Sequence, residues 1–419
     1  MRILLALILN TGLLWLLWRW VRREQRAPGV GKLVLPILTL KLAITLVTVA
    51  LLTEDARYFQ YWGVALTDQL WTAPIAWVGT LLGDEFHAAD RQLIYHGYSN
   101  TFFLIKVLSA LNLASLGNVW LNALYLSVFC LVGCWQLVRR FPHIFPDAPV
   151  LAVPIAFLLW PTVLYWTSGL TKESLLVSTL AWLTALVLDW LYEGRPVRAW
   201  SVVGAVVLVI VAFKMRYFFA VLLFAALLGL ALIRVGEQLG VRRRGVQVAL
   251  VMLLLSGGSW VLSEVNSIFR FNRFSSQLLR NYYGMLEQSR HKPHIEYAHL
   301  APTWQSVLSN APAAAMHTVL RPWLWESTQW NYLAVSIENV LLLVLLLTAA
   351  VAVVRGRGGR LPFALVLVLA IYCLGLAILL GLTTPNLGTL SRYRTVLLPF
   401  LLLLLLQNNY VAHWLKRWC

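Results

Sequence analysis

Residues 34–60 read VLPILTLKLAITLVTVALLTEDARYFQ, an apolar run that ends abruptly in two adjacent carboxylates, Glu54 and Asp55. About 20 consecutive apolar residues are what an α-helix needs to cross the hydrocarbon core of a bilayer. Residues 34–53 therefore predict a membrane-spanning helix. The two acids are expected at the membrane surface, where that helix ends.

Apolar runs of this kind recur along the whole 419-residue chain. Hydrophobic residues make up 60% of the sequence and charged residues only 12%, and the mean hydropathy is +0.74. A soluble domain of this length would need a charged surface that the sequence lacks, and the alternation typical of a membrane β-barrel is not seen. The sequence predicts one integral membrane domain over residues 1–419, all-α and polytopic.

The spacing of the apolar runs predicts about eleven membrane-spanning helices. Their expected ranges are 3–20, 34–53, 118–138, 150–168, 171–192, 198–213, 217–234, 246–263, 333–354, 361–382 and 394–411. Lys and Arg clusters between the runs mark cytoplasmic loops. They predict a protein integral to the cytoplasmic (inner) membrane, with the N-terminus on the outer side and the C-terminus, with Lys416, in the cytoplasm. Residues 101–116 form a short run that contains Lys106, so we expect a juxtamembrane or re-entrant helix along the outer surface rather than a span.

Two polar segments are expected on the extracytoplasmic side. The first, residues 54–117, would combine the acids with juxtamembrane helices, and the second is residues 264–332, with a helix near Ser275–Gln288. The second ends in an aromatic-rich stretch directly before a span. Trp and Tyr are enriched at the membrane interface, which favours an interfacial belt over the alternative of stacking on a sugar. The acids of the first segment are Glu54, Asp55, Asp84, Glu85 and Asp90.

The formal net charge of +17 does not indicate a nucleic-acid partner. The arginines form short clusters between apolar runs, where they orient the chain and contact anionic lipid headgroups. The expected partners are therefore membrane lipids, and no nucleic acid.

Some cations lie at helix ends that the predicted topology places outside, against the positive-inside rule. They are Arg57, Lys106, Lys172, Lys214, Arg216, Arg392 and Arg394. Ionisable residues at membrane depth are costly and commonly serve a function, although a single long side chain can instead extend to water. Arginine is suited to bidentate phosphate contact. The pattern predicts an outward-facing pocket for a lipid phosphate.

Asp55 is the first candidate for a general base in this pocket, because the preceding span fixes its position at the membrane surface. Consecutive helical residues point about 100° apart, so only one of Glu54 and Asp55 is expected to face the pocket. The carboxylate would take a proton from an acceptor while the cations offset the charge of a phosphate leaving group. The alternative is that Asp55 merely caps a helix.

Three short motifs resemble those of GT-C-type glycosyltransferases, multi-span enzymes that use polyprenyl-phosphate-linked sugars at the outer face. They are Glu54-Asp55-Ala-Arg-Tyr58, Trp166-Thr-Ser-Gly-Leu-Thr-Lys-Glu173 and Ser391-Arg-Tyr-Arg-Thr-Val-Leu-Leu-Pro399. The similarity in layout covers residues 34–410. An additional N-terminal span and a Lys-Glu pair in the second motif depart from the family pattern.

The resemblance implies transfer of a sugar from a polyprenyl-phosphate-linked donor to a glycan, lipid or protein acceptor in cell-envelope glycan or glycoconjugate synthesis. It implies Asp55, Glu54 and Glu173 as catalytic candidates. The implied substrate- and phosphate-binding residues are Arg57, Tyr58, Lys172, Lys214, Arg216, Arg392 and Arg394.

Alternative functions remain open from the sequence. An O-antigen-type polysaccharide polymerase or ligase would use arginines on large outer loops, and Arg270, Arg273, Arg280 and Arg290 fit that pattern. A lipid-linked glycan transporter would want ionisable residues near the bilayer midplane, whereas the charges here cluster at helix ends. A non-catalytic membrane scaffold is the remaining alternative.

No spacing in the sequence demands a metal. Carboxylate oxygens suit Mg²⁺ or Mn²⁺, so a divalent cation at the acidic segment is an open alternative. Its candidate ligands are Glu54, Asp55, Asp84, Glu85 and His87.

Overall fold

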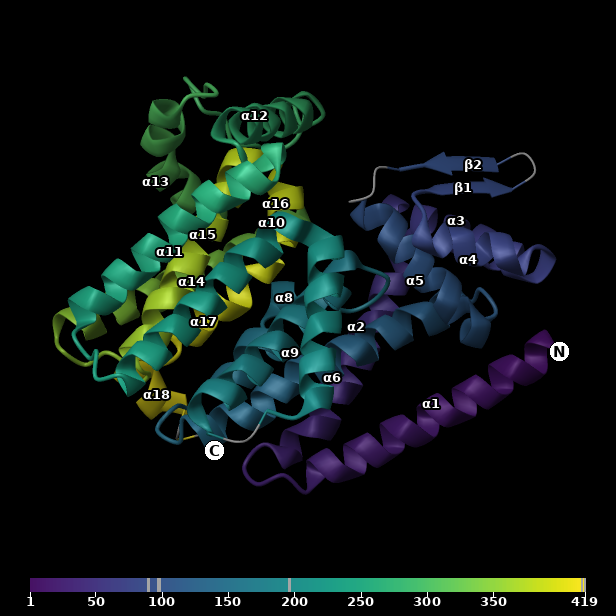
Figure 1. Cartoon of the computed structure of the whole chain (residues 1–419), viewed down its shortest axis with the longest axis horizontal. Coiled ribbons are helices and arrows are strands. Elements are labelled where there is room, and N and C mark those ends of the chain that lie inside the picture. The colour runs from purple at the N-terminus through teal and green to yellow at the C-terminus, as the bar shows by residue number, and fades with distance from the viewer. Residues whose placement is uncertain (89–90, 96–98, 195–196, 416, 418–419) are drawn as a thin grey trace.

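The computed structural model describes residues 1–88, 91–95, 99–194, 197–415 and 417 (Figure 1). Asp90 and Lys416 lie outside the described residues. Within them the regular secondary structure is helical apart from one antiparallel hairpin, in which β1 (Glu85–Ala88) pairs with β2 (Arg91–Ile94), and an isolated bridge between His294 and Asn386. The structure supports an all-α polytopic membrane protein, to which the hairpin is an unpredicted addition.

Eight helices in the described part of the chain are long and apolar enough to cross a bilayer. They are α1 (Arg2–Gln25), η1 with α2 (Gly31–Ala50), α6 (Val119–Ile144), α9 (Lys172–Tyr192), α10 (Ala199–Gln238), α11 (Arg244–Val265), α14 (Trp330–Val354) and α15 (Phe363–Thr383). A bent pair, Leu387–Val396 and Leu398–Leu405 at 64°, makes nine if it counts as one span. The chain is multi-pass, but the predicted count of eleven is not confirmed.

Helix breaks explain the difference in count. The expected spans 198–213 and 217–234 form one 40-residue helix, α10, whose backbone is non-helical at Arg216 (φ −157°, ψ 88°). A straight helix of that length would be about 60 Å long, twice the hydrocarbon thickness. The break at Arg216 lies between the two expected spans, where the sequence predicted a turn of the chain.

A proline breaks the segment that was expected to span at 150–168. It divides into α7 (Ala152–Pro154), the π-helical η2 (Ile155–Leu159) and α8 (Pro161–Trp166). Trp160 is extended (φ −61°, ψ 127°), because a residue that precedes proline is disfavoured in the helical region. The last expected span, 394–411, is likewise divided. Its pieces are η4 (Arg394–Val396), α17 (Leu398–Leu405) and α18 (Asn409–Leu415).

The first polar segment forms α3 (Glu54–Thr72), α4 (Pro74–Leu82), the hairpin and α5 (Asn100–Ser115). At 16 residues, α5 is apolar but shorter than the candidate spans. A separate small core of Leu66, Phe86, Phe102 and Ile105 holds this segment together.

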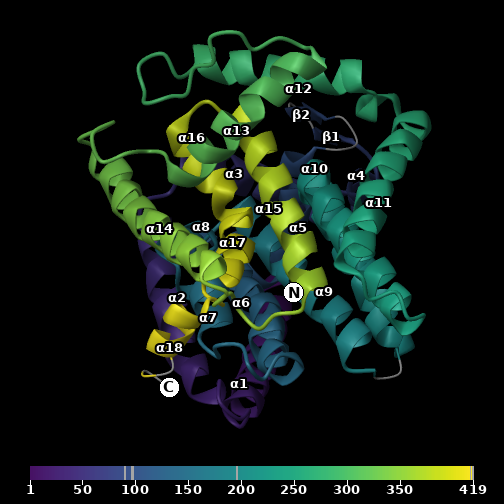
Figure 2. The same ribbon diagram turned by 90° about the vertical axis from the view of Figure 1, so that its left-hand side faces the viewer.

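The second polar segment contains α12 (Phe271–Glu287), close to the predicted helix, and the unpredicted α13 (Trp304–Leu320). α12 lies across one end of the helical bundle, together with the hairpin and α16 (Leu387–Tyr393), while α18 lies at the opposite end (Figures 1 and 2). The two predicted outer segments thus share one end of the molecule.

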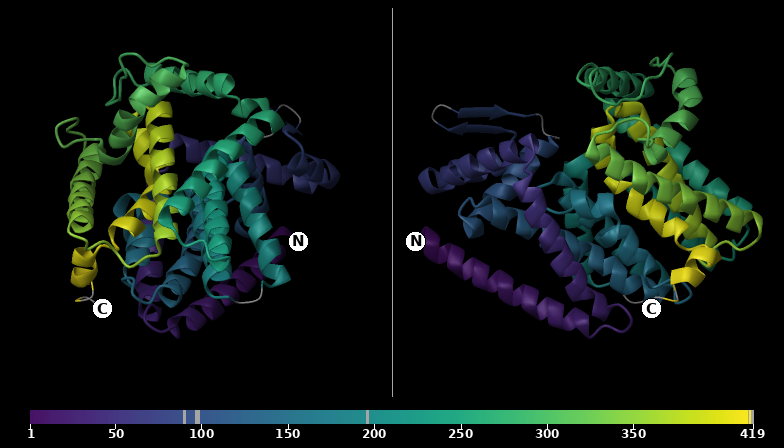
Figure 3. Two further views of the ribbon diagram at one scale, coloured as in Figure 1. Left: turned by 60° about the vertical axis from the view of Figure 1, so that its left-hand side comes forward. Right: turned by 180° about the vertical axis from the view of Figure 1, so that it is seen from behind.

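The main hydrophobic core joins the first and second halves of the chain. It runs through α6, α9 and α10 and continues into α15 and α17, with Trp135, Phe157 and Phe400 fully or almost fully buried. In contrast, α1 lies along one flank, apart from most of the bundle (Figure 3), and buries only Ala6 and Glu24. The bundle is therefore the rigid frame that positions the helix ends described next.

Candidate functional site: an ion cluster where three distant segments meet

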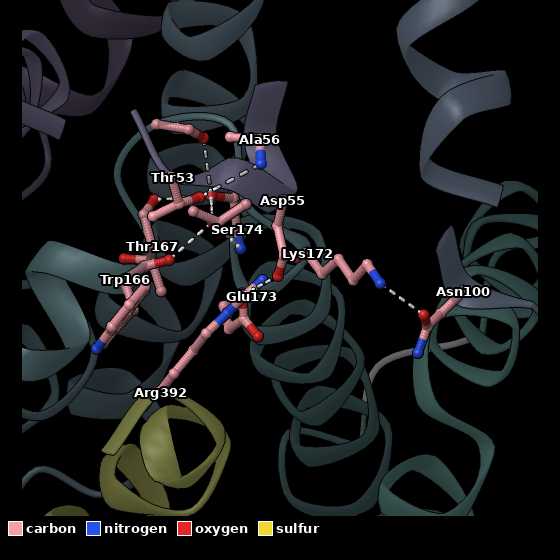
Figure 4. Close-up of polar contacts among 12 residues, drawn as sticks. Thr53, Asp55, Ala56, Asn100, Trp166, Thr167, Lys172, Glu173, Ser174 and Arg392 are labelled. Carbon is pink, nitrogen blue, oxygen red and sulfur yellow. Dashed lines mark hydrogen bonds and ion pairs between the residues drawn. The ribbon is translucent and has the colours of Figure 1, made fainter. Parts of the chain in front are cut away.

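The two acids at the start of α3, Glu54 and Asp55, have different partners. The N-cap is Thr53, whose side chain accepts a hydrogen bond from the Ala56 amide at 3.3 Å. Glu54 is 90% exposed and pairs with Arg57 at 3.1 Å. Asp55 instead pairs through Oδ2 with Nη1 of Arg392 at 2.8 Å (Figure 4). Asp55 is therefore not the cap, and it alone of the two acids reaches a distant segment.

The start of α9 brings in the second carboxylate. Thr171 is the N-cap and accepts from the Ser174 amide. The preceding turn contains Gly169 at a φ of +102°, a backbone conformation that favours glycine. The side chain of Glu173 is 1% exposed, with Oε2 at 3.0 Å from Nε of Arg392.

Arg392, at the end of α16, joins these two carboxylates. Its side chain is 14% exposed, and its guanidinium carbon lies 5.5 Å from the ring centre of Trp166. One guanidinium therefore contacts an exposed carboxylate and a buried one from helices far apart in the sequence (Figure 4).

Arg216 reaches the same cluster from the break in α10. Its Nη2 lies 3.9 Å from Oε1 of Glu173, and its guanidinium carbon lies 3.7 Å from the ring centre of Tyr393. At that range the ring face attracts the cation. The helix break thus places a cation beside the buried carboxylate.

Lys172 leaves α9 toward α5. Its Nζ donates to Asn100 Oδ1 at 2.7 Å (Figure 4) and to Thr101 Oγ1 at 2.8 Å. The same ammonium lies 4.8 Å from the ring centre of Phe59. No pattern in the sequence singles out Asn100 and Thr101, because they are two ordinary polar residues at the start of α5.

Lys214 lies two residues before Arg216, where α10 breaks, and interacts electrostatically with Lys106 of α5. Burial lowers the pKa of Lys106; the charge of Asp84 opposes this shift and that of Lys214 adds to it. Lys106 itself donates to the Gly83 carbonyl. Lys214 is therefore close enough to interact electrostatically with the first polar segment.

The other sequence-predicted residues do not join the cluster. Arg394 is fully buried, and its Nη1 donates to the carbonyls of Val319 at 3.3 Å and Arg321 at 3.2 Å. It therefore caps the end of α13. The hydroxyl of Tyr58 shares a hydrogen bond with Tyr95 at 2.8 Å, while Arg57 stays with Glu54.

Lys41 holds the turn that precedes α9, a role that was not predicted from the sequence. It lies in α2 with 1% exposure, and its Nζ donates to Thr167 O and Oγ1 at 2.9 Å each and to Ser168 Oγ at 3.4 Å. These bonds hold the turn that leads to Lys172 and Glu173. A lone lysine inside the apolar run 34–53 was the available signal.

The cluster contains more positive than negative charge. Two guanidiniums, those of Arg216 and Arg392, contact the carboxylates of Asp55 and Glu173. The ammonium of Lys172 points toward Asn100 but still interacts electrostatically with both carboxylates. Electrostatic interactions are stronger in such a partly buried site than in water. The arrangement can therefore hold one further anionic group, with a partly exposed carboxylate beside it.

The donor set does not fit a divalent cation. Asp55 and Glu173 are bridged by a guanidinium, and Glu54 pairs with Arg57. His87 pairs with Glu85 at 3.0 Å. Within the described ranges no three of the His, Cys, Asp and Glu residues gather in a metal-binding group.

Comparison with known proteins identified no relative of this chain. No family model, no curated protein and no solved structure matches this chain. The fold and the site define a class, an all-α multi-pass membrane protein with a partly buried ion cluster at one end.

Proposed function

We propose that the protein is a membrane glycosyltransferase of the GT-C type. It would move a sugar from a polyprenyl-phosphate-linked donor to a glycan, lipid or protein acceptor at the extracytoplasmic face of the inner membrane. The observation that carries the proposal is the convergence of Asp55, Glu173 and Arg392 from three distant segments. A partly exposed carboxylate lies there beside a group of cations.

In the proposed reaction, Asp55 takes the proton of an acceptor hydroxyl as its oxygen attacks the anomeric carbon of the donor sugar. A glycosidic bond forms, and the bond between that carbon and the phosphate oxygen breaks. The polyprenyl phosphate leaves with the bonding electron pair. The pairing of Asp55 Oδ2 with Arg392 orients the carboxylate, as a general base requires.

The cations of the cluster would stabilise the leaving phosphate. Preorganised donors aimed at developing charge supply a large part of enzymatic rate enhancement. Arg216 is the best placed, because its contact with Glu173 is long at 3.9 Å and leaves it able to bind a second anion. Glu173 is 1% exposed and therefore acts by positioning the two arginines.

The polymerase or ligase alternative receives less support. Of the outer arginines that suggested it, Arg270 donates to Ser263 O, Arg273 donates to Ser267 Oγ, and Arg290 pairs with Glu287. These are local contacts on an exposed surface. Arg280 alone of the four lines a cavity shared with the cluster residue Arg216.

The test is transfer by the purified protein from polyprenyl-phosphate-linked sugars to candidate acceptors. Asp55→Asn should fold normally and lower turnover by ~10²-fold or more. Glu54→Gln is the matched control, since that neighbouring carboxylate points away, and it should keep full turnover. Equal turnover in the two variants would remove Asp55 from the mechanism.

A further inference from the structure

Two adjoining cavities lie between α10, α11, α12 and α15. One has a volume of about 470 Å³ and the other of about 560 Å³. They share four wall residues, Phe218, Phe274, Leu278 and Leu379. The two cavities therefore adjoin along this wall, and together they are called the groove, with two compartments.

The two compartments differ in chemistry. The first is lined by two guanidiniums, Arg216 and Arg280, and by polar groups that include Gln277 and Asn281; among the described residues no carboxylate lines it. The second is lined by aromatic and aliphatic side chains and two serines, and no charged residue of the described part of the chain lines it. The groove thus suits a molecule with an anionic head and an apolar tail.

The amphipathic helix α12 forms the roof of both compartments. Leu278 and Phe274 lie in the shared wall, whereas Arg280 is exposed at the rim of the polar compartment. Amphipathic helices that lie along a membrane place their apolar face in lipid and their polar face in water. The head compartment is therefore expected at the aqueous side and the tail compartment at the lipid side.

The apolar compartment opens onto the lipid-facing surface. Trp260 of α11 lines it and is 67% exposed, and Phe271 lines it and is 42% exposed. α11 itself buries only Gln247 and Val251. A hydrocarbon chain can thus enter sideways from the bilayer between α11 and α12.

We propose that this groove binds a lipid phosphate with one long hydrocarbon chain, its phosphate between Arg216 and Arg280 and its chain in the apolar compartment. Arg216 also contacts Glu173 of the ion cluster, so the groove would be the donor site of the transferase. That assignment rests on the function proposed above. The binding site itself follows from the charge and shape of the groove alone.

Binding is measured by native mass spectrometry of the purified protein with four probes: a long-chain polyprenyl phosphate, the matching uncharged polyprenol, inorganic phosphate and phosphatidylglycerol. The polyprenyl phosphate should bind at least tenfold more tightly than each of the others. Equal binding of the polyprenol would overturn the head site. Equal binding of phosphatidylglycerol would show a general anionic-lipid surface and overturn the assignment.

The head compartment is tested with Arg280→Gln. Affinity for the polyprenyl phosphate should fall by about ten- to a hundredfold, the value of a charge-assisted contact. Arg273→Gln is the control, since Arg273 lies on the same helix but contacts Ser267. The head site is refuted if both variants bind like the parent.

The tail compartment is tested with Gly375→Leu and Ser259→Trp, which add bulk from two different helices. A Cβ at Gly375 would lie 3.7 Å from Leu222, an ordinary contact, so Gly375→Ala is the folding control. Ser256→Trp is the control on α11, since Ser256 is exposed and does not line the groove. Either bulky variant should weaken polyprenyl phosphate binding at least tenfold; unchanged binding in Ser259→Trp refutes the tail path.

The two proposals fail in different ways. Groove binding that obeys these variants while no sugar is transferred would reject the transferase and keep the lipid site. Transfer that depends on Asp55 but ignores the groove variants would keep the transferase and reject the site.

Discussion

Arg392 contacts two carboxylates that differ in burial, and this difference predicts two different effects of neutralising them. Glu173 is 1% exposed, whereas Asp55 is 61% exposed. Glu173→Gln keeps the side-chain volume and removes the buried charge, and Asp55→Asn does the same for the exposed one. We expect Glu173→Gln to lower the free energy of unfolding substantially and Asp55→Asn to change it little.

The magnitudes follow from the two environments. Removing one partner of a buried ion pair costs about 3–5 kcal/mol, because the remaining charge is left buried. Here Arg392 keeps Asp55 as a partner, so we expect ~2–4 kcal/mol for Glu173→Gln. Exposed pairs contribute about 0.2–1 kcal/mol, which sets the expectation for Asp55→Asn.

Thermal unfolding in detergent, followed by tryptophan fluorescence, measures the difference. Glu54→Gln is the control and should leave the midpoint unchanged, because Glu54 is 90% exposed. The small effect of Asp55→Asn should disappear at ~1 M salt, where the screening length is about 3 Å, while that of Glu173→Gln should persist. Equal destabilisation by the two variants would refute the assignment of Glu173 as the buried anchor of Arg392.

Two further outcomes are expected. Lys41→Met removes a buried ammonium that donates to Thr167 and Ser168. Hydrogen bonds to a charged group contribute about 1.5–3 kcal/mol, so the free energy of unfolding should fall. Hydrogen exchange at the amides of Gly169–Thr171 should become faster. Unchanged or higher stability would mean that desolvation of the ammonium offsets its bonds. The pKa of His294 is raised by its hydrogen bonds to the Lys292 carbonyl and to Glu296. The stabilisation of the fold by His294 should therefore be full below the unfolded pKa of about 6.5. It should be lost as pH rises through the higher pKa of the folded state. The unfolding midpoints of the parent and His294→Gln should then converge at alkaline pH, and a gap that widens with pH would contradict this assignment.

Some features of the site could be predicted from the sequence because they are local. A run of apolar residues can be compared directly with the bilayer thickness, so residues 34–53 indicated a span and the acids after it a surface position. The 100° step between helical neighbours predicted that Glu54 and Asp55 would diverge. The turn before Lys172 and the break near Arg216 also fell where the charges interrupt apolar runs.

Only the tertiary structure decided which of these residues meet. Asp55 and Arg392 are 337 positions apart, and no local pattern relates them. Nor does any local pattern indicate that Arg394 donates to helix carbonyls while Arg392, two residues earlier, contacts carboxylates. The physical reason lies in the membrane itself. A helix that is apolar all round carries no polar stripe to mark its packing face, and in lipid the association of helices depends on close packing and hydrogen bonds rather than on hydrophobicity. The pairing of Lys41 with Thr167, and the groove beneath α12, exist only once that packing is complete.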